Sequence, residues 1–277
     1  MKQEILFLLV ARGGSKGIQR KNLSIISGIS LIGLRSITAK KQRYFSRYII
    51  STDDEEIARE AKKYDIEVPF IRPDYLADDD SSSVDVVKHT INWIEKNEGI
   101  SYDAIFLAEP SSPFCRYQDI EKAIHLYEKN KPDLVVSVVK NKVHPMHMGE
   151  LGEDGDFSIV SSRLAKLPTG NRQQHNPNYI INGCVYLFGW EYFKKENSIF
   201  PYNGKTIAFE MPSEYSIEID EQIELDVTAI CCDFTEYEDL KEFHNEYSKE
   251  EYPNIDTLMD YTQVIENNDG SFIIQAF

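Results

Sequence analysis

Short apolar runs alternate with helix-like segments from Ile5 to Val139, and this alternation constrains the fold more than any other feature of the chain. Each run is almost continuously apolar, as expected for a strand that is buried on both faces of a sheet. The predicted strands are Ile5–Ala11, Tyr48–Ser51, Ala104–Ala108 and Leu134–Val139, and the predicted helices are Ile29–Lys40, one that opens with the capping-box pattern Thr52–Glu55, Val84–Lys96 after the same pattern at Ser82–Asp85, and one near Gln118–Asn130. This order predicts an α/β fold in which helices cover a mainly parallel sheet.

The alternation stops at residue 140. Residues 140–178 are rich in His, Pro, Gly and polar side chains, and we expect them to leave the sheet as a hairpin arm. The sheet resumes with the strands Asn182–Phe188 and Thr206–Phe209. A length of 277 residues suits one large domain. We therefore predict a single domain at residues 1–230 and an acidic extension of unknown role at residues 231–277.

Charge and cysteine content exclude several classes of protein. The net charge of −16 argues against a nucleic-acid-binding protein, which needs a basic face. The run Ile5–Ala11 is too short for a signal peptide or a membrane span. The four cysteines show no paired spacing, which indicates buried thiols in a reducing compartment; they are Cys115, Cys184, Cys231 and Cys232. We expect a cytoplasmic protein with neither nucleic-acid nor membrane partners.

The loop after the first strand carries the strongest functional signal. Residues Arg12–Asn22 include three glycines and four cationic side chains, with no acidic residue among them. Ligands of open parallel sheets bind outside the carboxyl ends of the strands, where this loop lies. Glycines let backbone amides approach an anion and mobile cations neutralise it, so the loop fits a triphosphate; a flexible, solvated loop is the alternative. The spacing matches neither a Walker loop nor a GxGxxG fingerprint, which argues against a P-loop kinase and a simple dinucleotide oxidoreductase.

The segment ARGGSKGIQRKN also resembles the signature of the acylneuraminate cytidylyltransferases, the CMP-sialic acid synthetases. Further blocks resemble that family in the same order: Ser51–Ile57, Pro69–Ala77 with Ser81–Ser83, Glu109–Pro113, Arg172–Gln174 with Asn182, Gly183 and Tyr186, and Ser216–Asp220 with Glu224–Asp226. These blocks span roughly residues 4–230. The resemblance implies a Rossmann-like three-layer α/β/α nucleotidyltransferase fold. It also implies a homodimer with a dimerisation arm at about residues 140–180.

The resemblance implies a reaction as well. The family transfers CMP from CTP to the anomeric hydroxyl of a nonulosonic (sialic-acid-like) nine-carbon sugar acid, releases pyrophosphate and gives a CMP-activated sugar for surface glycan synthesis. Such chemistry depends on positioning and charge neutralisation, and it needs a divalent ion, here Mg²⁺. Glu218 and Asp220 are the candidate metal ligands, because residues i and i+2 of a strand face the same side. The alternative is a half-exposed strand with both acids on its solvent face.

The family's site residues carry over to the matching positions of this chain. The residues expected to bind CTP are Arg12, Gly13, Gly14, Ser15, Lys16, Lys21, Asn22, Arg72, Ser81 and Ser83, those expected to act in catalysis are Arg12, Lys16, Lys21 and Asp220, and those expected to bind the sugar acid are Glu109, Arg172, Asn182 and Tyr186. Arg172 suits the sugar carboxylate, because a guanidinium binds a carboxylate in bidentate fashion. Without the resemblance, Asn182 and Tyr186 would be interpreted as a buried Asn-Gly turn and a core tyrosine, and Ser82 as a helix cap.

Two residues depart from the family pattern. Glu109 stands where the family usually has Gln, and Glu218 where it usually has Asp. An ionised Glu109 cannot donate a hydrogen bond and disfavours an acidic sugar unless a cation offsets it. The departure therefore favours a modified nonulosonate with an amino or amidine group; a neutral or rotated Glu109 is the alternative. Two other hypotheses remain: a catalytically degenerate nucleotide-sugar-binding module, and a cytidylyltransferase for another acid such as 3-deoxy-octulosonate.

Overall fold

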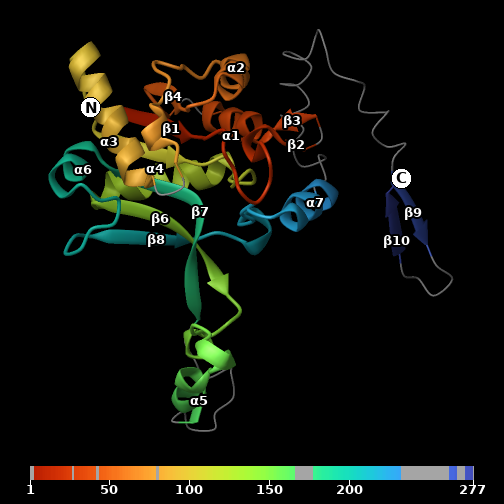
Figure 1. Ribbon diagram of the computed structural model, residues 1–277. Helices are drawn as coiled ribbons and strands as arrows, with labels where there is room; N and C mark the ends of the chain where they lie inside the picture. The colour runs from red at the N-terminus through yellow and green to blue at the C-terminus, as the bar shows by residue number, and fades with distance from the viewer. Residues whose placement is uncertain are drawn as a thin grey trace.

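The computed structural model describes residues 3–26, 28–41, 44–78, 81–165 and 177–231, together with the backbone of two strands at 262–266 and 272–276. A six-stranded sheet lies at the centre, in the order β4-β1-β5-β7-β6-β8 (Figure 1). Its strands are β1 (Ile5–Val10), β4 (Arg47–Ser51), β5 (Ala104–Ala108), β6 (Leu134–Asn141), β7 (Asn178–Gly189) and β8 (Thr206–Glu210). β1 pairs in parallel with β4 and β5, and β6 with β8, whereas β7 is antiparallel to both of its neighbours. The prediction of a mainly parallel sheet is confirmed.

Helices cover both faces of this sheet. The helices α1 (Leu31–Lys40), α2 (Glu55–Lys63) and α4 (Tyr117–Asn130) pack on one face, and α3 (Ser83–Glu98) and α6 (Trp190–Glu196) pack on the other. Two further helices are α5 (Ser158–Ala165) and α7 (Gln222–Cys231), and the short strands outside the sheet are β2 (Ile25–Ile26), β3 (Ile29–Ser30), β9 (Thr262–Glu266) and β10 (Phe272–Ala276). Among the residues that the structure describes, no helix is long and apolar enough to cross a membrane.

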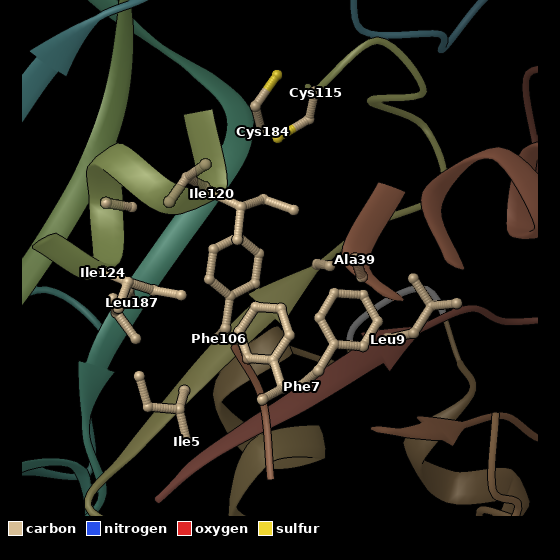
Figure 2. Close-up of a cluster of buried hydrophobic side chains, with 14 of the residues drawn as sticks. Ile5, Phe7, Leu9, Ala39, Phe106, Cys115, Ile120, Ile124, Cys184 and Leu187 are labelled. Atoms are coloured by element: carbon tan, nitrogen blue, oxygen red, sulfur yellow. The ribbon is translucent and has the colours of Figure 1, made fainter. Parts of the chain in front are cut away.

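Side chains of β1 alternate between two cores, as the pleat of a strand requires. Phe7 belongs to a core that also holds buried residues of α1, α2 and α4. Leu6 and Leu8 belong to a second core with residues of α3 and α6. Figure 2 shows the first core, where Phe7 stacks on Phe106 of the neighbouring strand β5 with ring centroids 5.9 Å apart. The predicted three-layer arrangement of helices, sheet and helices is therefore confirmed.

The helix starts show where local sequence was sufficient and where it was not. Ser82 caps α3 as expected, because its hydroxyl accepts a hydrogen bond from the Asp85 amide at 3.1 Å. For α2 the predicted cap, Thr52, is wrong. Thr52 remains extended and bridges Ile71, and Asp54 caps the helix instead by accepting hydrogen bonds from the amides of its first turn.

An arm projects from the body of the molecule (Figure 1). It consists of the outer halves of β6 and β7 with α5 at the far end, and it begins after a register shift between Val136 and Val138. Tyr179, Ile180 and Ile181 on the β7 half of the arm are exposed. The described part of the predicted excursion, residues 140–165 with 177 and 178, thus forms an arm, and its role in dimerisation stays a prediction. So does the boundary at residue 230, because most of residues 231–277 lie outside the described residues.

The strand that was assumed around Glu218 and Asp220 is absent. This segment is a loop that runs from a 3₁₀ turn at Ser213–Tyr215 to α7. The Ile219 amide donates a hydrogen bond to the carbonyl of Ser111, at 2.8 Å, instead of joining a strand ladder. Alternating acids and apolar residues fit an extended loop as well as a strand, because both place successive side chains on opposite sides. Because Ser111 follows β5, the hydrogen bond from Ile219 holds the loop at the carboxyl edge of the sheet.

Candidate functional site

A cavity of about 420 Å³ lies where β1 and β5 end. Ligands of open α/β sheets bind at this edge. The residues that line it are Val10, Arg12, Ser15, Lys16, Gly17, Lys21, Asn22, Arg72, Leu76, Asp78, Ser81, Ser83, Val86, Glu109, Pro110, Ser111 and Asp220. Most of the residues expected from the sequence to form a site are therefore brought together. Those that the structure describes but that do not line the cavity are Gly13, Gly14, Glu218, Asn182 and Tyr186.

The loop after β1 supplies the positive charge of the cavity. Arg12, Lys16 and Lys21 all belong to its lining. The Arg12 guanidinium donates a hydrogen bond to the carbonyl of Ala77, 3.4 Å away on another part of the wall. The buried side-chain amide of Asn22 donates to the Arg12 carbonyl at 3.0 Å and so ties the two ends of the loop together. These two hydrogen bonds thus hold in place the loop that carries the cations.

The loop before α7 is held against the same cavity. Lys21 Nζ donates hydrogen bonds to the Ile219 carbonyl at 2.7 Å and to Asp220 Oδ1 at 2.8 Å. The two loops approach so closely that a β-carbon on Gly17 would lie 2.2 Å from the Asp220 carbonyl oxygen. Glycine is therefore the residue that fits at position 17. No local sequence pattern indicates this contact, because the two loops lie far apart in the chain.

Arg72 forms another part of the wall, and its side chain is 2% exposed. Its Nη2 donates a hydrogen bond to Oδ1 of Asp53 at 3.2 Å. Burial lowers the pKa of Arg72, the bond to Asp53 raises it, and the nearby Arg12 lowers it again. The backbone amide of Gly13 donates to the same Asp53 oxygen, also at 3.2 Å. A carboxylate that the sequence analysis did not single out thus connects two predicted nucleotide-binding segments.

The segment before α3 completes this wall. Ser81 and Ser83 line the cavity, and the Ser81 hydroxyl donates a hydrogen bond to the Tyr75 carbonyl at 3.1 Å. Ser82 points elsewhere, because it caps α3. Asp78, which the sequence analysis did not consider, also lines the cavity. Asp78 reaches the cavity because segments that are distant in the chain come together there, so no local sequence pattern indicates its position.

Glu109 is the acidic residue at the end of β5, and it lines the cavity. Burial raises the pKa of its carboxyl group, and the carboxylates of Glu218 and Asp220 raise it further, while Lys21 and Arg35 act in the opposite direction. A protonated carboxyl group has one O–H donor and a carbonyl acceptor, as an amide has a donor and an acceptor. This environment thus favours the neutral form of Glu109, which the sequence analysis held as the alternative.

Glu218 lies behind the cavity wall, against β7. A β-carbon on Gly183 would lie 2.9 Å from Glu218 Oε1 and 3.1 Å from Ser112 Oγ, so both side chains rest on the bare backbone at Gly183. Gly183 has φ of +72°, which glycine adopts without strain. Burial raises the pKa of Glu218, and so does the neighbouring Asp220. The two acids of the loop therefore occupy different environments.

The side chains of Asn182 and Tyr186 make contacts within the fold and do not line the cavity. The side-chain oxygen Oδ1 of Asn182 accepts a hydrogen bond from the Ser137 hydroxyl at 2.5 Å, and its side-chain Nδ2 donates to the Ser216 hydroxyl at 2.8 Å, which anchors the loop before α7. Tyr186 packs with the second core, and its ring makes an edge contact with Phe200. Burial raises the pKa of Tyr186 to about 12, with further contributions from Glu109, Glu218 and Cys184.

Two predicted features have a limited structural record. Arg172 lies outside the described residues. Among the residues that are described, no group of three or more His, Cys, Asp or Glu side chains is arranged to hold a metal ion. Cys115 and Cys184 are buried free thiols, as expected.

Comparison with known proteins gives a consistent result. The family model described as cytidylyltransferase matches residues 6–252. CMP-N,N'-diacetyllegionaminic acid synthase from Campylobacter jejuni is 29% identical to the chain over 224 residues, which cover 81% of the chain and 93% of that protein. N-acylneuraminate cytidylyltransferase A from Danio rerio is 31% identical over 222 residues, which cover 80% of the chain and 49% of that protein. The resemblance inferred from the motif blocks is confirmed.

One solved structure shares the fold. It is described as CMP:2-keto-3-deoxy-manno-octonic acid synthetase complexed with CTP, and it superimposes with a TM-score of 0.61 at 12% identity, covering 82% of the chain and 97% of that structure. At this level of identity the likeness concerns the fold alone. It agrees with the three-layer arrangement expected from the sequence.

Proposed function

The chain belongs to the cytidylyltransferase family, and we propose that it transfers the cytidylyl group of CTP to the anomeric hydroxyl of a nonulosonic sugar acid. The observation that carries this proposal is the cavity at the ends of β1 and β5, where Arg12, Lys16 and Lys21 meet. Three cations at the edge of the sheet where ligands bind match the charge of a triphosphate. The product would be a CMP-activated sugar acid for surface glycan synthesis.

CTP is bound by two parts of the cavity wall in this proposal. The loop after β1 takes the triphosphate, with the amides of Gly14 and Ser15 beside the cations, while the Gly13 amide is engaged by Asp53. The wall formed by Arg72, Ser81 and Ser83 takes the cytidine. The hydrogen bond from Arg12 to Ala77 supports this division, because it joins the phosphate loop to the segment that carries the second wall.

The chemical step is a displacement at the α-phosphate. The anomeric hydroxyl of the sugar loses its proton to solvent as its oxygen forms a bond to the α-phosphorus, the bond from that phosphorus to the bridging oxygen breaks, and pyrophosphate leaves. Negative charge develops on the leaving pyrophosphate, and Lys16, Lys21 and Arg12 neutralise it from the positions they occupy around the cavity. These side chains therefore stabilise the transition state by position and charge.

A divalent ion fits the oxygen donors at this site. Asp220 lines the cavity with a side chain that is 66% exposed, and Glu218 lies two residues before it. Mg²⁺ is held by one or two carboxylates together with phosphate oxygens and water, so a complete cage of protein ligands is not required. We assign Asp220 as the ligand that lines the cavity, and Glu218, which does not line it, stays the second proposed ligand. When bound, the ion would supply Lewis-acid charge at the phosphates.

The sugar acid lies beside Glu109 in this proposal, since Glu109 lines the cavity next to Pro110 and Ser111. Burial and the neighbouring carboxylates act against the charged form of Glu109, and a cationic group of the ligand would offset both and form an ion pair with it, which favours a nonulosonate with an amino or amidine substituent. Arg172 remains the proposed partner of the sugar carboxylate.

We also propose that the protein is a homodimer whose arm covers the sugar site of the second subunit. The exposed apolar side chains of Tyr179, Ile180 and Ile181 on the arm support a role in association. The buried free thiols of Cys115 and Cys184 support a location in the reducing cytoplasm.

The experiment that tests the function is an assay of pyrophosphate release with CTP, Mg²⁺ and a panel of sugar acids. The panel contains N-acetylneuraminate, amino- and amidine-substituted nonulosonates and 3-deoxy-octulosonate. Turnover with a nonulosonate supports the proposal, and turnover with 3-deoxy-octulosonate alone would reassign the substrate. Binding of CTP without turnover of any acid would contradict it and favour a nucleotide-sugar-binding module.

A further inference from the structure

The carboxylate of Asp53 lies between two parts of the cavity wall without lining the cavity itself. Its Oδ1 accepts one hydrogen bond from the Gly13 amide and one from Arg72 Nη2, both at 3.2 Å. Its side chain is 19% exposed, and Arg72 is 2% exposed. Asp53 therefore influences a bound ligand through these two partners and not by direct contact.

The topology of the sheet explains this placement. β1 and β4 are parallel neighbours with Val10 opposite Ser51, so the residues that follow each strand leave the same edge side by side. The Ala11 amide extends the pairing by donating to the Ser51 carbonyl at 3.2 Å. On the other side, the Arg72 amide donates to the Thr52 carbonyl at 2.7 Å. Position 53 is thus the place from which one side chain can reach both the phosphate loop and Arg72.

The charges around Arg72 make this carboxylate necessary. Arg12 lies close enough to act unfavourably on the Arg72 guanidinium, and within the described part of the chain Arg72 Nε has no hydrogen-bond partner. Asp53 forms the ion pair with Arg72. Removal of one partner of a buried pair leaves an uncompensated charge, and that charge is free to change its position.

We propose that Asp53 is a positioning residue for the nucleotide, holding the start of the anion-binding loop and the Arg72 guanidinium at a fixed spacing through a single carboxylate. The inference rests on the proposed function for the identity of the ligand, CTP. It assigns to Asp53 no contact with the reacting atoms. Its consequence is that the phosphate loop and the nucleoside wall bind CTP as one coupled unit.

The test is the dissociation constant of CTP, measured by calorimetry without sugar, for wild type, Asp53→Asn and Asp53→Ala. Asp53→Asn keeps an acceptor oxygen and removes the charge, so we expect about tenfold weaker binding, with a larger loss for Asp53→Ala. The steady-state KM for CTP should rise in parallel while the KM for the sugar stays unchanged. The control is Glu98→Gln, which removes a carboxylate paired with Arg47 at the opposite end of β4 and should bind CTP like wild type.

A double-mutant cycle tests the coupling itself. If Asp53 acts through Arg72, Asp53→Ala and Arg72→Ala together should weaken CTP binding by clearly less than the product of their separate effects. Independent effects, or wild-type affinity in both Asp53 variants, would overturn the inference. Asp53→Asn is the variant to use in the cycle if Asp53→Ala does not fold. Failure of the proposed function is distinguishable, because wild type would then bind no CTP or turn over no sugar acid, whereas the inference is tested by the CTP affinities of the variants relative to wild type.

Discussion

Lys21 and Asp220 form an ion pair 2.8 Å long across the cavity, although 199 positions separate them in the chain. Lys21 belongs to the loop that takes the triphosphate in our proposal, and Asp220 is the proposed metal ligand. This ion pair therefore connects the proposed triphosphate site with the proposed metal site. It also explains how the loop before α7 stays at the site, since Lys21 holds the Ile219 carbonyl as well.

Substitution of Lys21 tests the phosphate site. Lys21→Ala should lower kcat/KM, because it removes one well-placed charged donor. The expected loss of transition-state stabilisation is about 2–4 kcal/mol. Steady-state kinetics with varied CTP measures this loss. Arg12→Ala provides the companion measurement, and wild-type kinetics in both variants would show that the triphosphate binds elsewhere.

Substitution of Asp220 tests the metal site. Asp220→Asn should abolish turnover, a loss of at least about a hundredfold in kcat, in a protein that still unfolds cooperatively. Glu218→Asp should retain activity, since it restores the usual family residue. Glu221→Gln is the matched control, because it removes an exposed carboxylate next in the chain. Full Mg²⁺-dependent activity in Asp220→Asn would mean that other residues hold the ion.

Local sequence predicted the framework of this site well. Continuous apolar runs gave β1, β4, β5 and β6, because strands buried on both faces need apolar side chains at every position. Ser82 was recognisable as a cap because its hydroxyl and the acidic Asp85 act within one helical turn. The cationic loop was recognisable because composition and strand order together fix its place.

The remaining features depend on contacts between distant segments. The segment of Glu218 and Asp220, which was assumed to be a strand, is a loop, and no alternation pattern distinguishes a strand from an extended loop. Asp53 was missed because its partners, Gly13 and Arg72, become its neighbours only through the pairing of β1 with β4 and the approach of residue 71 to residue 52. The difference between Glu218 and Asp220 likewise depends on Gly183, which leaves room for one of the two acids.

The environment of Glu109 predicts a pH dependence of stability. Its folded-state pKa is raised above the ordinary 4.5, so the folded protein holds this proton to a higher pH than the unfolded chain does. The carboxyl group of Glu109 therefore destabilises the fold progressively as pH rises from about 4.5 to the raised value. Glu109→Gln removes this effect, by about 1.4 kcal/mol for each pH unit between the two pKa values.

Denaturant unfolding of wild type and Glu109→Gln over a pH series measures this difference. The advantage of the variant should be smallest at low pH and should grow as pH rises through that window. Glu214→Gln, at an exposed carboxylate, is the control and should follow the wild type. A variant whose advantage is constant with pH would show that Glu109 ionises normally in the folded protein.

The arm predicts the state of assembly. Ile180 is 47% exposed on β7, and burial of such a side chain in a dimer contributes about 1.5–3 kcal/mol. Ile180→Asp should therefore weaken association at least tenfold, as measured by sedimentation at micromolar concentration. Ile100→Asp changes a similarly exposed isoleucine on the body, and it should leave the dimer intact. An active wild-type monomer at this concentration would contradict the proposed role of the arm.

Sugar choice depends on Glu109 in our proposal, because this residue replaces a neutral amide at the cavity wall. Burial and the nearby carboxylates of Glu218 and Asp220 raise the pKa of Glu109 in the absence of ligand, whereas a cationic sugar substituent beside it would favour the ionised form and pair with it. Wild type should therefore prefer an amino- or amidine-substituted nonulosonate over N-acetylneuraminate.

Glu109→Gln should move the ratio of kcat/KM values towards N-acetylneuraminate by about tenfold, the size of one modest hydrogen-bond exchange. The measurement is kcat/KM for both sugars with both proteins. A wild-type preference for N-acetylneuraminate, or an unchanged ratio in the variant, would show that Glu109 does not determine specificity.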